Sequence, residues 1–226
     1  MPIASSGRLP VCTSAGCAAK FFAPASHLSV ELINLKLVRG QVADSGTTMT
    51  KKSYPLSKVY GLLEPGPVLL LTTFHDGVAN VMTMSWQTMI EFEPPLIGCV
   101  ISNRNHSFEM LKASKQCVIN IPTAEIAEKV VGCGNTSGAK INKFEQFGLT
   151  QKPASLVTAP LIDECFASLE CRVVDTGLVA KYGMFVIEVV KAWLDPAVKN
   201  PRTIHHQGHG NFMLAGERIK LKSAMK

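Results

Sequence analysis

The sequence lacks any apolar stretch long enough to cross a bilayer as a helix. Of its 226 residues, 46% are hydrophobic, yet the longest uninterrupted apolar runs, such as 67–71 and 96–101, are far shorter than the roughly 20 residues that a membrane helix needs. Aromatic residues make up only 7% of the chain and charged residues 18%, which is unlike disordered, collagen-like or coiled-coil proteins. We therefore expect a globular protein that makes no use of a membrane.

The cysteines lack the spacing of a metal site or a disulfide framework. The seven cysteines form no C-x-x-C pair and are odd in number, and Cys99 and Cys117 lie within apolar runs. This pattern is typical of reduced, buried thiols rather than of a secreted disulfide framework, so we expect a cytoplasmic protein. Cys99 has no neighbour that would lower its pKa, so we interpret it as a core thiol rather than a nucleophile.

Several motifs that would define a site are also missing. The chain contains no G-x-G-x-x-G fingerprint, no P-loop and no G-x-S-x-G elbow. Residues 132–134 (GCG) are interpreted as a helix terminator within a loop over 132–140. His205, His206 and His209 lie close in sequence, but Gly208 and Gly210 argue against a helix there and no acid or cysteine completes a ligand set. We predict no metal site, and a hydrogen-bonding or surface role for these histidines.

Positive charge is in modest excess over negative charge. Lysine and arginine number 23 against 17 acids, which gives a formal net charge of +6. Nucleic-acid binders concentrate their basic residues on one face, whereas here these residues are scattered, with short groups at Lys51-Lys52 and in the last nine residues. We therefore expect a small phosphorylated ligand rather than a nucleic acid.

Residues 1–48 differ from the remainder of the chain. They are rich in Ala and Ser, show no sustained periodicity, and contain no acid before Glu31. The composition loosely resembles an organellar transit peptide; an unstructured extension, or an upstream start ahead of Met49, explains it as well. We expect a poorly ordered extension over 1–48 and one folded domain over 49–226.

The folded part is dominated by strand patterns. Asp76-Gly77 separates two apolar, β-rich runs, 68–74 and 79–86, and such a dipeptide is a strong hairpin signal. Further strands are predicted over 96–102, 117–121, 166–174 and 184–194, and helices over 107–116, 124–131 and 141–147, the last ended by Gly148. The predicted fold is mainly β with α additions, and a β-barrel is favoured over a parallel sheet.

The most informative segment follows the strand over 96–102. Ser102, Asn103, Arg104, Asn105 and Ser107 precede or open a helix, where free N–H groups, short polar side chains and an arginine can hold a phosphate. An alternative is an ordinary cap, with Asn105 or Ser107 capping the helix and Arg104 in solvent. The residues alone leave both interpretations open.

Four ordered stretches resemble the flavin reductase-like family, whose fold is an FMN-binding split barrel and which includes flavoredoxin. The stretches cover about two thirds of the chain, from about residue 65 to 217. They are the hairpin ending in N-V-M-T-M-S-W at 80–86, E-P-P at 93–95 followed by S-N-R-N-H-S at 102–107, C-V-I-N-I-P at 117–122, and the segment from Ser137-Gly138 to G-L-T at 148–150.

The resemblance implies FMN as cofactor, bound non-covalently near the interface of a homodimer. It implies that Ser102, Asn103, Arg104 and Ser107 hold the phosphate and that Thr83, Met84, Ser85 and Trp86 line the isoalloxazine. Ser137, Lys143 and Phe144 would lie by the flavin edge, from either subunit, with Lys143 able to stabilise negative charge on the ring. The expected activity is an NAD(P)H-dependent flavin reductase, with NADH or NADPH as donor. The alternative is a flavoredoxin-like electron carrier between protein partners.

Overall fold

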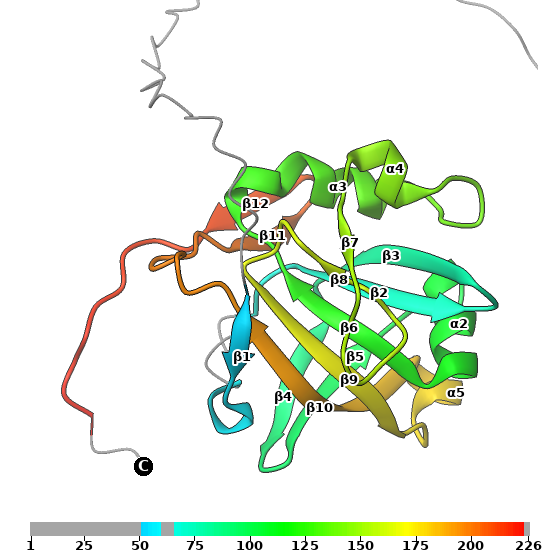
Figure 1. The fold of residues 1–226 in the computed structure, drawn as a ribbon, viewed down its shortest axis with the longest axis horizontal. Coiled ribbons are helices and arrows are strands. Elements are labelled where there is room, and N and C mark those ends of the chain that lie inside the picture. The colour runs from blue at the N-terminus through cyan, green and yellow to red at the C-terminus, as the bar shows by residue number, and fades with distance from the viewer. Residues whose placement is uncertain (1–50, 60–65, 224–226) are drawn as a thin grey trace, which may run out of the picture. The chain divides into compact units, whose positions relative to one another are not determined.

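A computed structural model describes residues 51–59 and 66–223, all within the compact unit formed by residues 46–226. The predicted extension over 1–48, and with it Cys12 and Cys17, lies outside the described residues. The main sheet has eight strands, paired in the order β3-β2-β6-β9-β10-β5-β4 with β1 also paired to β10, and every pair is antiparallel (Figure 1). The prediction of a mainly β fold with α additions is confirmed.

The elements have the following bounds. The main-sheet strands are β1 (Lys52–Tyr54), β2 (Leu69–His75), β3 (Val78–Met84), β4 (Gln87–Phe92), β5 (Pro95–Val100), β6 (Gln116–Ile121), β9 (Ala167–Asp175) and β10 (Met184–Leu194). Two small antiparallel pairs are β7 (Gln151–Lys152) with β8 (Leu161–Ile162), and β11 (Ile204–Gly208) with β12 (Asn211–Leu214). The helices are η1 (Leu56–Lys58), α2 (His106–Ser114), η2 (Ala124–Ile126), α3 (Ala127–Asn135), α4 (Lys143–Phe147) and α5 (Val179–Tyr182). None of the helices in this described part has the length and apolar character needed to span a bilayer.

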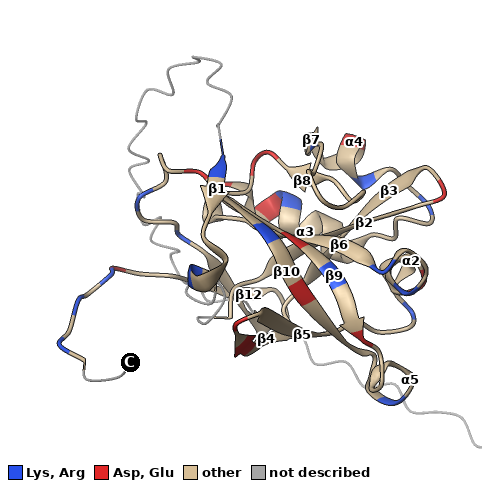
Figure 2. Cartoon of the chain, turned by 60° about the horizontal axis from the view of Figure 1, so that its bottom comes forward, with Lys and Arg blue, Asp and Glu red and all other residues tan. Residues whose placement is uncertain are grey.

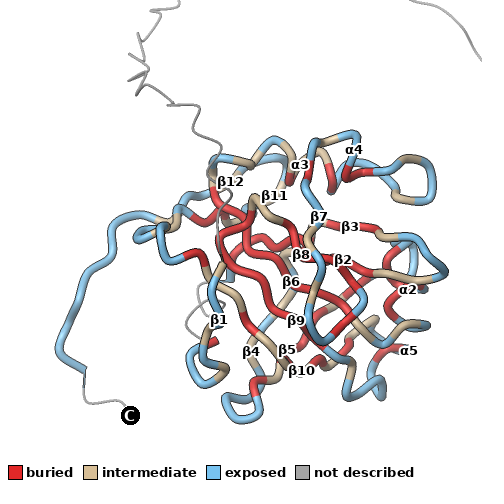
Figure 3. Tube along the Cα trace, in the orientation of Figure 1, coloured by how far each residue is buried: buried red, intermediate tan, exposed pale blue. Residues whose placement is uncertain are grey.

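Strand β2 is buried on both faces, which explains its continuous apolar run. Leu69 and Leu71 pack into the main core with Phe108 and Leu111 of α2, whereas Val68 and Leu70 pack into a second core beneath α3 and α4. Figure 3 shows the buried strands between these helical coverings. A strand covered on both sides has no solvent face, so the usual alternation of apolar and polar residues is absent.

The turn between β2 and β3 follows the predicted chemistry. Asp76 has φ 49° and Gly77 has φ 77°, as a tight two-residue hairpin turn requires. Gly148, with φ 57°, ends α4 in the left-handed conformation that favours glycine. Both predictions are confirmed.

The prediction that residues 132–134 end a helix is wrong. Helix α3 continues through both glycines to Asn135, while residues 124–126, the start of the helix predicted over 124–131, form η2. A Cβ added to Gly132 would lie 2.4 Å from the ring of Phe147 in α4. Glycine is therefore present because α3 and α4 approach closely, and not because the helix stops.

The five described cysteines are buried and free, as expected. Burial raises the pKa of the Cys133 thiol to about 11, and it raises the pKa of Cys99 above its ordinary value. A thiol that stays protonated is a poor nucleophile. The interpretation of Cys99 as a core thiol is confirmed.

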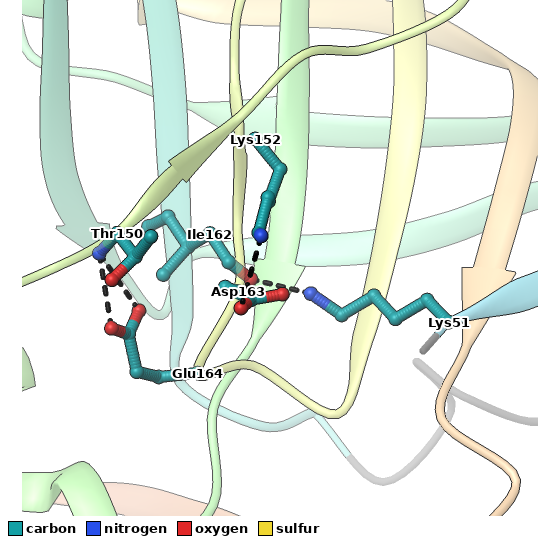
Figure 4. Close-up of polar contacts among 6 residues, drawn as sticks. All are labelled: Lys51, Thr150, Lys152, Ile162, Asp163 and Glu164. Atoms are coloured by element: carbon teal, nitrogen blue, oxygen red, sulfur yellow. Dashed lines mark hydrogen bonds and ion pairs between the residues drawn. The ribbon is translucent and has the colours of Figure 1, made fainter. Parts of the chain in front are cut away.

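The β7–β8 pair is tied to the residue that precedes β1. The Lys51 ammonium donates to the carbonyl of Ile162 in β8, and burial lowers its pKa. Beside it, Lys152 forms an ion pair of 3.7 Å with Asp163, as Figure 4 shows. The contact between Lys51 and Ile162 joins residues 111 positions apart in sequence.

A fully buried carboxylate anchors the loop after β7. Glu170 accepts hydrogen bonds from the backbone N–H groups of Ser155, Leu156 and Val157, from the Ser155 hydroxyl and from the indole N–H of Trp193. Burial alone would raise its pKa, but these donors outweigh it and hold the pKa below the ordinary value.

We expect Glu170→Gln to destabilise the fold by about 2–3 kcal/mol, because the amide nitrogen would face donors that need an acceptor. A depressed pKa stabilises the native state above the unfolded-state pKa, and this contribution is lost as pH falls through the folded-state value. Urea unfolding from about pH 6 to about pH 3 should therefore show a shallower loss of stability in the variant than in the wild type. Parallel curves would contradict this assignment.

Candidate functional site

A cleft of about 880 Å³ opens where β3, β5 and α2 meet α5. Its walls come from three stretches that are distant in sequence, together with the outer face of α2. They are residues 82–86, residues 100–105, residues 179–183, and Phe108, Glu109 and Lys112. The cleft therefore brings together Thr83, Met84, Ser85 and Trp86 with Ser102, Asn103 and Arg104, which are seven of the residues predicted to bind the cofactor.

The loop between β5 and α2 presents polar groups to solvent. Ser102, Asn103 and Arg104 are exposed. Two hydrogen bonds within the loop fix its shape. The N–H of Asn105 donates to the carbonyl of Ser102 (2.9 Å), and the N–H of Arg104 donates to the Ser102 hydroxyl (3.3 Å). Asn105 occupies the N-cap position of α2, but its side chain makes no capping hydrogen bond. The start of α2 thus has its partial positive charge without a side-chain cap, which suits an anion.

The stretch over 83–86 forms another wall of the cleft. The Thr83 hydroxyl donates to the carbonyl of Val130 in α3, and Met84 is buried. Trp86 is 71% exposed, and its carbonyl accepts from the N–H of Val100 at 3.0 Å. An aromatic ring held at an open cleft is suited to contact a planar ligand.

Helix α5 lies against the end of β5 because of one glycine. Gly183 has φ 66°, its carbonyl accepts from the N–H of Ile101 at 2.9 Å, and a Cβ there would lie 2.4 Å from the Ile101 carbonyl oxygen. Sequence reasoning missed the α5 contribution to the cleft. The available signal was a glycine directly before a long strand, at 183–184.

Four predicted cofactor residues do not line this cleft. Ser107 is buried, and its hydroxyl accepts a hydrogen bond from the Asn80 amide at 2.8 Å. Lys143 is also buried, and its ammonium donates to the Cys133 carbonyl at 2.7 Å. Burial lowers the pKa of Lys143. Phe144 is buried in the second core, and Ser137 is exposed on the loop between α3 and α4. Within this chain the Lys143 charge is directed at its own backbone, and a contribution of these four residues to the cofactor stays a prediction.

The three histidines lie on the β11–β12 hairpin and its turn. The His205 ring is 3.0 Å from the Thr203 hydroxyl, the His206 ring packs against the ring of Phe212, and His209 has φ 49°. Among the residues that the structure describes, no three His, Cys, Asp or Glu side chains are placed to hold a metal ion.

The architecture is that of split-barrel flavin reductase-like proteins. It is similar to an FMN-binding domain of a flavin reductase-like enzyme from Shewanella baltica, with a TM-score of 0.74, 26% identity and coverage of 77% of this chain and 99% of that one. A flavoredoxin from Methanosarcina acetivorans has a TM-score of 0.59 and 26% identity, with coverage of 69% and 87%.

Sequence comparison assigns the family. Residues 62–212 match the flavin reductase like domain, so the chain belongs to that family. The expected family and split-barrel fold are confirmed. The chain is also 27% identical, over 65% of its length and 74% of the other's, to the reductase component of a 4-nitrophenol 4-monooxygenase/4-nitrocatechol 2-monooxygenase from Rhodococcus opacus.

Proposed function

We propose that this chain binds FMN in the cleft and acts as an NAD(P)H-dependent flavin reductase. The observation that carries the proposal is the exposed loop with Arg104 before the uncapped start of α2, within a cleft of a flavin reductase-like fold. A planar guanidinium and free helical N–H groups match the oxygens of a phosphomonoester.

The chain's residues divide into two groups with different roles. Ser102, Asn103 and Arg104 hold the phosphate, and residues 83–86 line the isoalloxazine. Bound FMN supplies the redox chemistry by accepting a hydride and passing electrons on, while the protein binds and orients it. Trp86 lines the cleft and is 71% exposed, so a nicotinamide would approach a bound flavin from this solvent-exposed wall.

The fit between cleft and cofactor also involves the surrounding charge. Arg104 has no carboxylate partner among the described residues, and the described ion pairs lie at His75–Asp76, Lys112–Glu109 and Lys152–Asp163. Its guanidinium is therefore available to an anion. We include a homodimer in the proposal, with Ser137, Lys143 and Phe144 close to the flavin of either subunit.

A flavoredoxin-like electron carrier is the second candidate. Similarity to the Methanosarcina flavoredoxin favours it, and the net charge of +6 suits an acidic redox partner, because complementary charge raises the rate of encounter. In this case the nicotinamide nucleotides are not substrates.

Anaerobic stopped-flow mixing separates the two candidates. The FMN-loaded protein is mixed with NADH or NADPH, and flavin absorbance is followed, with free FMN and the same nucleotide as the control. We expect the protein to bleach with at least one nucleotide, much faster than free FMN. Absence of bleaching with both nucleotides would reject the reductase and favour the carrier.

A further inference from the structure

The α5 wall of the cleft carries a lysine that none of the roles above uses. Lys181 lines the cleft, and its ammonium lies 4.9 Å from the ring centroid of Tyr182. Helix α5 and helix α2, which starts at the polar loop, both contribute residues to the cleft, and Figure 2 shows basic residues on each of them. A cation over an aromatic face is attracted to it and is restricted in its motion.

The balance of charge in the cleft distinguishes Lys181 from its neighbours. Among the described residues, the cleft is lined by three cations, Arg104, Lys112 and Lys181, together with the carboxylate of Glu109. Lys112 lies 3.9 Å from Glu109, one helical turn away, so its charge is partly offset. Within residues 51–59 and 66–223, neither Arg104 nor Lys181 forms an ion pair with a carboxylate.

The backbone places these two unpaired cations close to a common point. The contact between Gly183 and Ile101 joins α5 to the end of β5. Lys181 is two residues from this contact and Arg104 is three residues from it, so their Cα atoms lie within about 7 Å and about 11 Å of it. Both residues line the same cleft.

We propose that Lys181 is the second cation of the phosphate site, with Tyr182 positioning its ammonium. This inference rests on the proposed FMN site and adds a determinant of ligand selectivity. A phosphomonoester carries a charge of about −1.5 to −2 at neutral pH, of which Arg104 neutralises one unit. Lys181 neutralises the remainder, and it thereby favours FMN over riboflavin, which has the same ring without the phosphate.

The test compares FMN with riboflavin in three variants. Lys181→Gln removes the charge, Lys181→Arg keeps it, and Lys191→Gln removes a charge from a similar pair, 5.0 Å from the ring of Trp193 on β10 and outside the cleft. We expect Lys181→Gln to weaken FMN about tenfold, leave riboflavin unchanged and reduce the salt dependence of FMN binding. Lys181→Arg should restore most of the affinity, and Lys191→Gln should match the wild type.

The outcomes separate this inference from the proposed function. If the wild type binds neither flavin, the proposed function fails and the inference fails with it. If the wild type binds FMN and Lys181→Gln binds it equally well, only the inference is overturned. Equal losses of affinity for FMN and riboflavin would also overturn it, because the substitution would then affect binding of the flavin ring or the stability of the fold. Thermal unfolding of each variant shows whether the fold is intact.

Discussion

Arg104→Ala is expected to weaken FMN binding about a hundredfold and to leave riboflavin binding nearly unchanged. Arg104 is exposed in the loop between β5 and α2 and has no carboxylate partner in the described residues. Two parallel hydrogen bonds from a guanidinium to phosphate oxygens are charge-assisted, and together they contribute about 3 kcal/mol. Riboflavin has no phosphate, so its affinity should not be reduced by this substitution.

Fluorescence titration with both flavins measures this difference. Arg218→Ala is the matched control, because Arg218 is exposed in the C-terminal segment, donates to the Lys199 carbonyl and lies outside the cleft. The control should bind FMN as the wild type does. Equal losses for FMN and riboflavin in Arg104→Ala would show that Arg104 does not contact the phosphate.

Gly183→Ala is expected to destabilise the protein by about 3 kcal/mol or more and to abolish high-affinity FMN binding. Two costs combine at this residue. Its φ of 66° is unfavourable for any residue with a Cβ, and that Cβ would lie 2.4 Å from the backbone oxygen of Ile101. Since a backbone atom cannot rotate away, α5 must separate from β5, which opens the cleft next to Ser102.

Gly66→Ala is a matched control for the backbone cost. Gly66 also has φ 66°, but among the residues that the structure describes no atom lies within 4 Å of its added Cβ. Its substitution should cost only about 1–2 kcal/mol, the usual penalty for the left-handed conformation, and should leave FMN binding intact. Urea unfolding and FMN titration of both variants test the difference. Equal destabilisation would show that the approach of α5 to β5 has no energetic importance.

Local sequence patterns predicted the elements whose structure is determined by residues within the same segment. The turn at Asp76-Gly77 needs two positive φ angles, and the dipeptide supplies them. Strand β10 has the predicted bounds of Met184–Leu194 because its alternating apolar residues line the main core. The polar loop before α2 could be identified because helix starts have distinctive residue types.

Other elements depend on tertiary contacts that no local pattern reveals. Strand β4, from Gln87 to Phe92, lies at a sheet end with no fully buried residue, so it has no apolar face to detect. The β11–β12 hairpin was missed because its turn, with positive φ at Gly208, His209 and Gly210, departs from the usual hairpin dipeptides. The glycines of α3 were misinterpreted because Phe147, from another helix, requires the space at Gly132.

The candidate site was predictable only in part for the same reason. The segments over 83–86 and 102–104 carry residue types that suit a flavin and its phosphate, and the fold brings them to one cleft. The α5 wall arises from a contact between residues 101 and 183, which are far apart in sequence. The buried environment of Lys143 is likewise a tertiary feature, since its ammonium in α4 donates to the Cys133 carbonyl in α3.

Titration of the purified full-length chain with FMN tests most directly whether this cleft is a flavin site. Quenching of flavin fluorescence is followed to saturation, with riboflavin as the comparison ligand. The proposed site predicts saturable binding of one FMN per chain and markedly weaker binding of riboflavin. A protein that binds no FMN at saturating concentrations would contradict the proposed function, and equal affinity for the two flavins would contradict the phosphate site at Arg104.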